Sequence, residues 1–286
     1  MGDRAQLRGS VLRELLLEPA GPVGRLEVVA RVGSTNSELS AALTRDPAAW
    51  PGMGMLVADH QVGGRGRSGR DWETPARAAL TLSISVWPTE PVANLGWLPV
   101  LTGLASVHAL RATAGVQATL KWPNDLLIPA PHAAELAGWG LQRKVGGILS
   151  ELVTTPVGPA VVLGIGLNVS QTPAELPVPS AISLAVAEAR DVDREVLLVA
   201  LVTAFADVYA RWRAVGGDVV AAGLADEVAS VCATIGQRVH VALPGGGVLV
   251  GLALRLDPEG ELVVLDDVGT EHVVLAGDVL HVRAVN

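Results

Sequence analysis

The chain has 286 residues, of which 50% are hydrophobic, and a formal net charge of -8. This composition excludes a disordered chain, because it can bury a large core, and we expect one sizeable domain followed by a small one. Non-specific affinity for DNA or RNA comes from a basic surface, so the negative charge argues against nucleic acid as the main partner.

The first predicted element is an amphipathic helix over residues 4–17, with leucine and valine side chains on one side. The first ten residues are charged and polar rather than an apolar signal region, so we expect a cytoplasmic protein. Residues 1–24 are predicted to be this N-terminal helix and a linker. They are too few for a helix-turn-helix domain, so we expect no DNA partner.

Residues 26–32 alternate apolar and polar positions and are predicted to form a strand, which turns directly into a helix. Ser34, Thr35 and Asn36 stand at this turn, and Thr35 and Glu38 have the spacing of a capping box. The pattern therefore predicts a helix N-terminus with polar side chains just past a strand end.

A short predicted strand leads into residues 63–70, which read Gly-Gly-Arg-Gly-Arg-Ser-Gly-Arg. Glycine lets the backbone approach a ligand closely, and each arginine offers bidentate donors that suit phosphate or carboxylate. We call this segment the arginine loop. Its composition predicts an anion-binding site in a chain whose net charge is negative. Arg-Gly runs also occur in flexible RNA-binding segments, so the loop alone leaves both interpretations open.

A predicted strand over residues 79–86 leaves the loop, and a long apolar helix follows over residues 93–114. The uncharged stretch 91–110 is long enough to cross a bilayer, but it contains polar residues such as Asn94 and no basic cluster flanks it. We therefore expect a buried helix and no membrane partner. His108, in this helix, is expected to be a packed side chain rather than a general base.

Residues 121–125, at the end of the next predicted strand, read Lys-Trp-Pro-Asn-Asp. The ordinary interpretation is a turn beside a solvated lysine. However, the chain has nineteen arginines and only two lysines, Lys121 and Lys144. A site that needs a compact, movable ammonium cannot readily use a guanidinium instead. We therefore predict that these two lysines serve the chemistry of a site.

Residues 128–139 are rich in alanine and proline and are predicted to be a hairpin or surface insertion, in which Trp139 has no assigned purpose. Two strands follow over residues 144–153 and 159–169, with glycines where a ligand can come close. A helix is predicted over residues 193–214.

The pattern changes from residue 236 onward to short alternating segments separated by turns, the last of them over residues 279–283. Strands this short and evenly spaced predict a small barrel. The lone cysteine, Cys232, permits no internal disulfide and no cysteine-rich metal site.

Several of these segments together resemble the biotin protein ligase family in their order and spacing. They are Ser34-Thr35-Asn36, Gln61 with residues 64–70, residues 121–125, residues 144–149 and residues 164–168. The resemblance implies an α/β (α+β) catalytic domain of the biotin/lipoate ligase type over residues 25–232, with a mixed sheet flanked by helices. It also implies a small C-terminal SH3-like β-barrel over residues 233–286.

The resemblance implies a reaction in two halves. Biotin and ATP give biotinyl-5'-AMP and pyrophosphate, and a lysine of the biotin carboxyl carrier domain of an acyl-CoA carboxylase then displaces AMP. Because an anionic carboxylate must approach an anionic phosphate, the site needs positive charge to offset the repulsion. Lys121 and Arg67 are the candidate catalytic residues, and Arg70 is expected to hold the arginine loop over the adenylate.

The resemblance further implies the binding residues. Those expected to contact biotin are Ser34, Thr35, Asn36, Gln61, Gly64, Arg65, Gly66, Arg67, Lys121 and Gly147. Those expected to contact ATP or the adenylate are Arg65, Arg67, Arg70, Trp72, Asn124, Lys144 and Asn168. Mg²⁺ bridging the phosphates is expected at Asn124 and Asp125 on chemical grounds.

We expect ligase activity alone, because residues 1–24 leave no room for the DNA-binding domain of the family members that are also repressors. We expect a monomer or a weak homodimer. Two other functions stay open. One is a lipoate or octanoate ligase or transferase of the related fold, whose fatty-acyl pocket would not require the arginine loop. The other is an RNA-binding protein that uses the Arg-Gly loop, which the net charge opposes.

Overall fold

The computed structural model describes residues 4–130, 132–190, 193–243, 247–275 and 278–281. Residues 282 and 283, the end of the last predicted strand, lie outside the described residues. Two large sheets form the framework, a seven-stranded one with the order β1-β2-β5-β9-β8-β7-β6 and a five-stranded one with the order β13-β12-β11-β10-β14.

In the seven-stranded sheet β1 runs parallel to β2, and every other neighbouring pair is antiparallel. The predicted mixed sheet is therefore confirmed. Its strands are β1 (Arg25–Val29), β2 (Gly54–Ala58), β5 (Ala79–Val86), β6 (Thr119–Lys121), β7 (Asp125–Pro129), β8 (Gln142–Thr155) and β9 (Gly158–Asn168).

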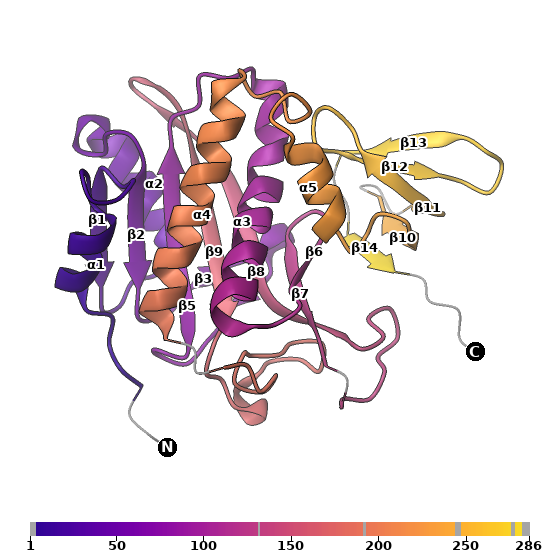
Figure 1. The fold of residues 1–286 in the computed structure, drawn as a ribbon, viewed down its shortest axis with the longest axis horizontal. Helices are drawn as coiled ribbons and strands as arrows, with labels where there is room; N and C mark the ends of the chain where they lie inside the picture. The colour runs from indigo at the N-terminus through magenta and orange to yellow at the C-terminus, as the bar shows by residue number, and fades with distance from the viewer. Residues whose placement is uncertain (1–3, 131, 191–192, 244–246, 276–277, 282–286) are drawn as a thin grey trace.

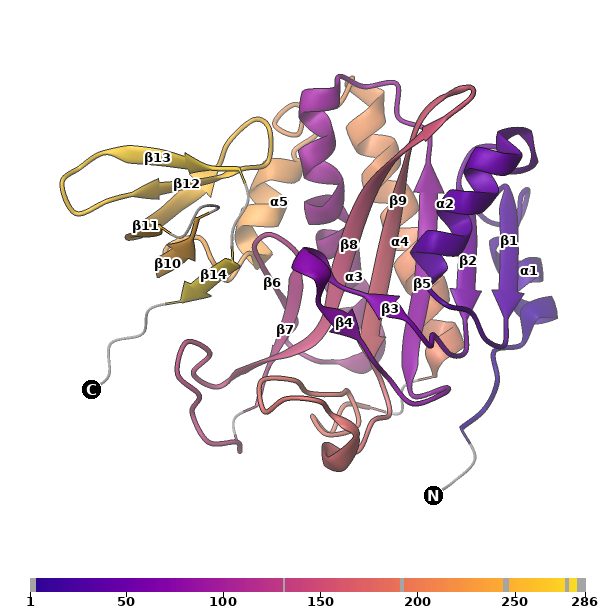
Figure 2. The same cartoon turned by 180° about the vertical axis from the view of Figure 1, so that it is seen from behind.

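Helices cover both faces of this sheet. Figure 1 shows α3 and α4 side by side across one face, and Figure 2 shows α2 on the other face, near the short strands β3 (Gly64–Arg65) and β4 (Asp71–Trp72). The helices are α1 (Gly9–Leu16), α2 (Thr35–Arg45), α3 (Trp97–Ala114), α4 (Arg194–Ala214) and α5 (Leu224–Val231). Single 3-10 turns lie at Pro47–Ala49, Arg67–Gly69, Val92–Gly96 and Pro173–Glu175.

The inner strand β5 shows why the two faces differ. Leu80, Leu82 and Ile84 belong to the main hydrophobic core under α3 and α4. Because successive side chains of a strand point to opposite faces, the residues between them point toward α2. These include Ser83 and Ser85, which are fully buried polar side chains. The α2 face of the sheet is therefore the one that offers hydrogen-bonding groups.

The long apolar helix is a core element, as predicted. Val92–Ala114 is long and apolar enough to cross a membrane, but 61% of its most apolar stretch is buried inside the protein. A core helix of a soluble protein passes the same test of length and composition, so the helix is weak evidence for a membrane span. His108 is exposed on α3, so the prediction that it is packed is wrong: even this helix keeps a strip that faces solvent.

The five-stranded sheet is antiparallel throughout. Its strands are β10 (Arg238–Ala242), β11 (Val248–Leu256), β12 (Leu262–Leu265), β13 (Glu271–Val274) and β14 (Asp278–His281). The predicted run of short C-terminal strands is confirmed, whereas their closure into an SH3-like barrel stays a prediction.

Two indole side chains, one on α3 and one just after β6, fasten this second sheet to the rest of the protein. Trp97 Nε1 donates to the carbonyl of Pro258 at 2.8 Å, and Trp122 Nε1 donates to the carbonyl of Gly260 at 3.0 Å. Gly96 permits the approach, because a Cβ there would lie 2.3 Å from the Glu259 carbonyl oxygen. The turn between β11 and β12 thus rests against the strand end that carries Lys121.

Candidate functional site

The site begins at the N-terminus of α2, where Ser34 is the N-cap and its Oγ accepts a hydrogen bond from Ser37 N at 3.4 Å. The predicted capping box, which has Thr35 as the N-cap and Glu38 three residues later, is therefore wrong, because the N-cap is the preceding residue, Ser34. Because Ser34 caps the helix, the side chain of Thr35 is available for other contacts. Its Oγ1 and its backbone N both donate to Gln61 Oε1, at 2.9 and 2.7 Å.

These two bonds fix the orientation of the Gln61 amide. Its oxygen is occupied by Thr35, so its NH₂ group is the donor that Gln61 presents to the adjacent cavity. Ser83 Oγ lies 2.8 Å from Thr35 Oγ1 and 2.6 Å from Asn36 Oδ1, which joins strand β5 to both side chains. Ser83 was not among the predicted site residues.

Asn36 is held by a second strand as well. Its Nδ2 donates to the Leu149 carbonyl at 3.1 Å and to Glu151 Oε2 at 2.7 Å, both on β8. Gly164 on β9 makes room for it, because a Cβ at that position would lie 2.3 Å from Asn36 Oδ1. The asparagine is thus fixed from three strands.

The arginine loop is a small hairpin in which β3 (Gly64–Arg65) pairs with β4 (Asp71–Trp72). Gly64 faces Trp72 in this pair, and a Cβ there would lie 2.4 Å from the Trp72 carbonyl oxygen. Gly64 therefore shapes the hairpin instead of lining a cavity. Gly166 on β9 makes room for the Trp72 indole in the same way, because a Cβ at Gly166 would lie 2.6 Å from a carbon of the indole ring.

The arginines of the loop have different partners. Arg65 NH2 contacts both carboxylate oxygens of Glu151 at 3.0 Å. Arg67 NH1 donates to Asn124 Oδ1 at 3.1 Å, and Arg70 Nε donates to the Arg67 carbonyl at 3.2 Å. The loop is therefore tied to β8 and to the Pro-Asn-Asp turn at once.

The two lysines of the chain share one carboxylate. Lys144 Nζ lies 2.6 Å from Asp125 Oδ1, and Lys121 Nζ lies 4.0 Å from Asp125 Oδ2. Lys121 is only 7% exposed, although it ends strand β6. Each ammonium also faces an indole, since Lys121 Nζ lies 4.7 Å from the centroid of the Trp139 ring and Lys144 Nζ 5.9 Å from that of Trp72.

The predicted Mg²⁺ ligands are engaged with other groups. Asp125 accepts from Lys144, Asn124 Oδ1 accepts from Arg67, and Asn124 Nδ2 donates to the Ile148 carbonyl at 2.9 Å. Within the described ranges no group of three or more acidic, histidine or cysteine side chains could hold a metal ion. Mg²⁺ in nucleotide sites is held by one or two carboxylates together with substrate phosphates, so the site at Asn124 and Asp125 stays a prediction, and we assign no metal step to it.

Two adjoining cavities share the walls that these residues form, and the smaller has a volume of about 80 Å³. It is lined by Ser34, Thr35, Asn36, Gln61, Arg65, Gly66, Arg67, Arg70, Asp71, Trp72, Asn124, Lys144, Gly147, Ile148, Leu149, Gly164, Ile165 and Gly166. All the residues predicted to contact biotin are among them except Gly64 and Lys121.

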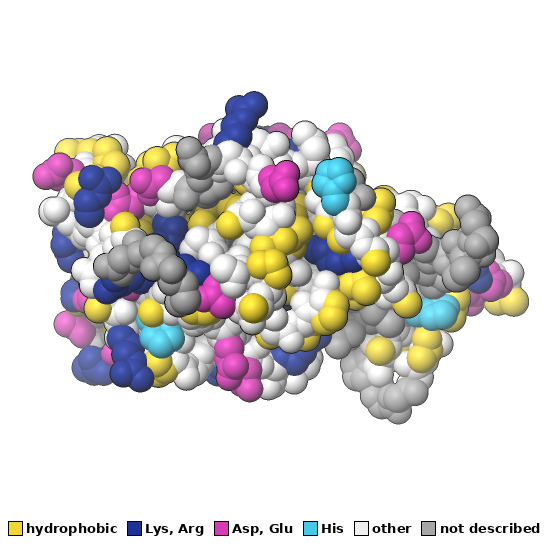
Figure 3. Space-filling model, turned by 90° about the horizontal axis from the view of Figure 1, so that it is seen from below, with side chains coloured by type: hydrophobic (Ala, Val, Ile, Leu, Met, Phe, Trp, Pro, Cys, Tyr) yellow, Lys and Arg dark blue, Asp and Glu magenta, His cyan; other side chains and the backbone are white. Residues whose placement is uncertain are grey.

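The larger cavity has a volume of about 670 Å³. It is lined by Arg70, Asp71, Trp72, Glu73, Lys121, Trp122, Pro123, Asn124, Asp125, Trp139, Lys144, Asn168, Pro177, Val178, Ser180, Ala181, His240, Ala242 and Val248. Seen from below, basic side chains lie recessed between hydrophobic ones on this side of the molecule (Figure 3). Of these two adjoining cavities, the larger one alone reaches the usual size of a small-molecule site.

Of the predicted ATP residues, Arg70, Trp72, Asn124 and Lys144 line both cavities, whereas Arg65 and Arg67 line the smaller one and Asn168 the larger. Trp72 Nε1 is buried and has no hydrogen-bond partner among the described residues. A buried donor without an acceptor is unfavourable, and this nitrogen lies against Gly166 on β9, 2.8 Å from where a Cβ of that residue would be.

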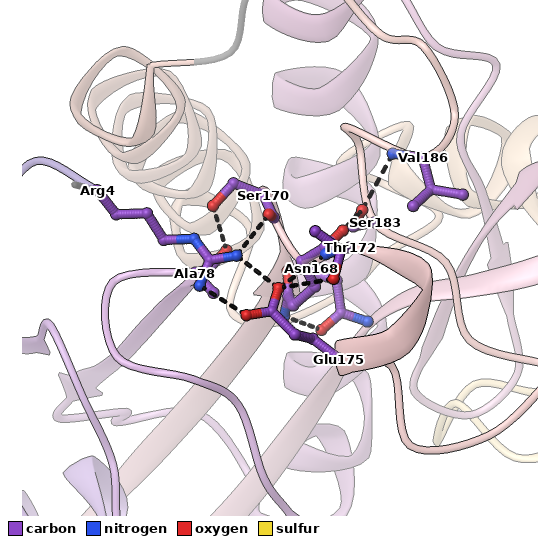
Figure 4. A network of polar contacts seen from close by, with 9 residues as sticks. Arg4, Ala78, Asn168, Ser170, Thr172, Glu175, Ser183 and Val186 are labelled. Atoms are coloured by element: carbon purple, nitrogen blue, oxygen red, sulfur yellow. Dashed lines mark hydrogen bonds and ion pairs between the residues drawn. The ribbon is translucent and has the colours of Figure 1, made fainter. Parts of the chain in front are cut away.

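Asn168 has a structural task besides lining the cavity. Its Nδ2 donates to the Ile182 carbonyl at 3.1 Å, and its Oδ1 accepts from Gln171 Nε2 at 2.8 Å. Figure 4 shows it inside a polar network that orders the segment after β9, with Arg4 at one edge and Val186, bonded to Ser183, at the other. Both polar groups of Asn168 are therefore engaged without any ligand.

Several cavity residues were not predicted from the sequence. The sequence alone assigns no role to Trp139, and its contact with the Lys121 ammonium is what connects it to the site. His240, Ala242 and Val248 come from the second sheet, and Val178 and Ala181 from the segment after β9. No local pattern marks these residues, because tertiary packing alone brings them to the cavity.

The chain is similar to known proteins in both of its parts. The Biotin/lipoate A/B protein ligase family matches residues 28–168, and the Biotin protein ligase C terminal domain matches residues 234–282. The chain is 39% identical to a biotin–[acetyl-CoA-carboxylase] ligase of Mycobacterium tuberculosis over 99% of this chain and all of that one. It is 29% identical to the bifunctional ligase/repressor BirA of Bacillus subtilis over 78% of this chain and 64% of that one.

Among solved structures, the biotin protein ligase of Aquifex aeolicus in complex with biotin and ATP superposes with a TM-score of 0.71 and 26% identity. The match covers 91% of this chain and all of the Aquifex chain. The similarity of fold thus extends over both sheets.

Proposed function

The chain belongs to the biotin/lipoate A/B protein ligase family, and we propose that its two adjoining cavities bind biotin and ATP for a biotin–[acetyl-CoA-carboxylase] ligase reaction. The observation that carries this proposal is their common wall. Trp72, Asn124 and Lys144 line both cavities, so two ligands bound there would meet at these side chains. A reaction that joins a carboxylate to a nucleotide needs this arrangement.

The smaller cavity suits the head group of biotin, a cyclic urea that offers one carbonyl acceptor and two N–H donors. Gln61 presents an NH₂ donor there, and Ser34 adds a hydroxyl group. Ser83 and Glu151 hold Thr35 and Asn36 in place from behind. A polar cavity of about 80 Å³ has room for the head group alone, so the valeryl chain would extend toward the larger cavity.

The larger cavity suits ATP. Its aliphatic walls, which include Pro177, Val178 and Val248, offer a place for the purine, and its two ammonium groups offer a place for phosphates. A biotin carboxylate oxygen attacks the α-phosphorus, a P–O bond forms, and the bond to pyrophosphate breaks. Arg67 and Lys121 stabilise the charge on the phosphoryl oxygens as this happens.

The product of this half-reaction is a mixed anhydride that water would hydrolyse. The arginine loop covers the smaller cavity, and its contacts from Arg65 to Glu151 and from Arg67 to Asn124 keep it there. Exclusion of water by the loop protects the adenylate until the acceptor arrives. An acceptor lysine amine then attacks the biotinyl carbonyl carbon, an amide bond forms, and AMP leaves.

The proposal keeps the remaining expectations from the sequence. The acceptor is the biotin carboxyl carrier domain of an acyl-CoA carboxylase, and the enzyme is cytoplasmic and a monomer or weak homodimer. The net charge of -8 supports an enzyme that does not bind DNA. The polar cavity beside the arginine loop favours biotin over lipoate or octanoate, whose chains offer few hydrogen-bonding groups.

The test is ATP-dependent transfer of biotin to a purified carrier domain. Wild-type protein should biotinylate it, and Arg67→Ala and Lys121→Ala should each lose about 100-fold or more, the usual cost of removing one group that stabilises transition-state charge. Full activity in both variants would overturn the assigned roles. No transfer by the wild type would overturn the proposed function itself.

A further inference from the structure

We propose that Trp139 is a positioning residue that holds the Lys121 ammonium at the larger cavity. The inference rests on the proposed function, because it concerns how that reaction is prepared. Lys121 Nζ lies 4.7 Å from the centroid of the Trp139 ring and 4.0 Å from Asp125 Oδ2. The ammonium therefore has an indole face and a carboxylate as neighbours.

The loop between β7 and β8 is built to present this indole. Trp139 stands between Gly138 and Gly140, whose φ angles of 73° and 54° are left-handed. Such angles suit glycine, so the turn is encoded on both sides of the tryptophan. Within it, Gly140 N donates to the Leu136 carbonyl at 2.7 Å, and Leu136 N donates to the Gly140 carbonyl at 3.1 Å.

A buried arginine fastens the same loop. Arg143 is 4% exposed, and its NH1 donates to the carbonyls of Gly140 and Gln142, each at 2.8 Å. Its NH2 donates to the carbonyl of Ala134. A guanidinium buried against backbone oxygens fixes the loop on which Trp139 stands, so the indole is presented by a constrained turn.

The contact matters because lysine is flexible. Its ammonium ends a four-carbon stem and can point in many directions, so the side chain alone does not specify where the charge lies. The indole face attracts the cation, and the attraction is strongest where water is excluded. The side chain of Lys121 is 9% exposed, so Trp139 helps to set the position from which the ammonium reaches an incoming carboxylate or phosphate.

The small number of lysines makes the contact directly measurable. Protein labelled with ¹³C-lysine has two side-chain signals, because Lys121 and Lys144 are the only lysines. The signal that disappears in Lys121→Ala belongs to Lys121. We expect its Hε protons to be shifted upfield by the indole, to lose this shift in Trp139→Leu and to keep part of it in Trp139→Phe. The signal of Lys144, which lies beside Trp72, should be unchanged in both Trp139 variants and so shows that these variants are folded.

Activity is followed by single-turnover formation of biotinyl-5'-AMP in a double-mutant cycle. Trp139→Leu should slow it between about 2-fold and 30-fold, the range of a cation–π contact, and Trp139→Phe should recover most of the rate. In the Lys121→Ala background, Trp139→Leu should have little further effect, because the indole acts through that lysine.

Three results would overturn the inference while leaving the proposed function intact: a Lys121 signal without a ring-current shift, a wild-type rate in Trp139→Leu, or an undiminished effect of Trp139→Leu in the Lys121→Ala background. The last result would mean that the indole contacts the substrate itself. A wild-type protein that forms no biotinyl-5'-AMP would instead contradict the proposed function.

Discussion

At the residue scale, the polar side chains of the smaller cavity depend on neighbours that hold them in one orientation. Asn36 donates to Leu149 and Glu151 and accepts from Ser83, so its amide cannot turn without losing a bond. Hydrogen-bonded side chains fixed in advance reduce the entropy lost on binding. The selectivity of the cavity therefore rests on residues that need not touch the ligand.

Glu151 offers the first test of this dependence. Glu151→Gln removes the charge that both Arg65 and Asn36 contact, and we expect the KM for biotin to rise about 3-fold to 10-fold, because a charge-assisted hydrogen bond is replaced by a neutral one. The matched control is Glu271→Gln, which removes a similar partner from Arg255 on the second sheet. Equal KM values for Glu151→Gln and wild type would contradict the assigned role.

Two glycines provide a second test. Gly164→Ala places a Cβ 2.3 Å from Asn36 Oδ1, so the amide must move, and the KM for biotin should rise about tenfold or more. Gly33→Ala is the control, because a Cβ at Gly33 meets nothing within 4 Å. The measurement is steady-state adenylation at varied biotin concentration. The same KM in both variants would mean that the position of Asn36 does not matter for binding.

At the scale of elements, the strands and helices were largely predictable, because alternation and helical periodicity are local properties of the sequence. The predicted strand over residues 79–86 coincides with the observed strand β5. The helix predicted over residues 193–214 is one residue longer than the observed α4, which begins at Arg194. The segment after β9 was not described from the sequence, because its order comes from the polar network around Asn168 rather than from any periodic pattern (Figure 4).

That segment gives a pH-dependent prediction. Hydrogen bonds from Arg4, followed by those from Thr172, lower the pKa of Glu175 from 4.5 to about 2. A depressed carboxyl pKa stabilises the folded state above the unfolded pKa, and this stabilisation is lost as pH falls from 4.5 toward 2. The Tm of wild type should therefore exceed that of Glu175→Gln above pH 5, and the gap should narrow by pH 3. A gap that is constant with pH would contradict the role of this ion pair.

At the scale of the whole molecule, the two sheets meet beside the site. Trp97 and Trp122 donate to the turn between β11 and β12, and the second sheet supplies His240 and Val248 to the larger cavity. The sequence predicted the order of the sheets along the chain and the glycine, arginine and lysine motifs of the site. It did not predict Ser83, Glu151 or Trp139, because each acts through a contact between segments far apart in the sequence.

The central claim is that the two adjoining cavities activate biotin with ATP, and ATP–pyrophosphate exchange measures that step without any acceptor protein. We predict exchange that requires biotin, is not supported by lipoate or octanoate, and falls about 100-fold or more in Arg67→Ala and Lys121→Ala. Exchange supported equally well by lipoate or octanoate, or exchange that does not depend on biotin, would contradict the account.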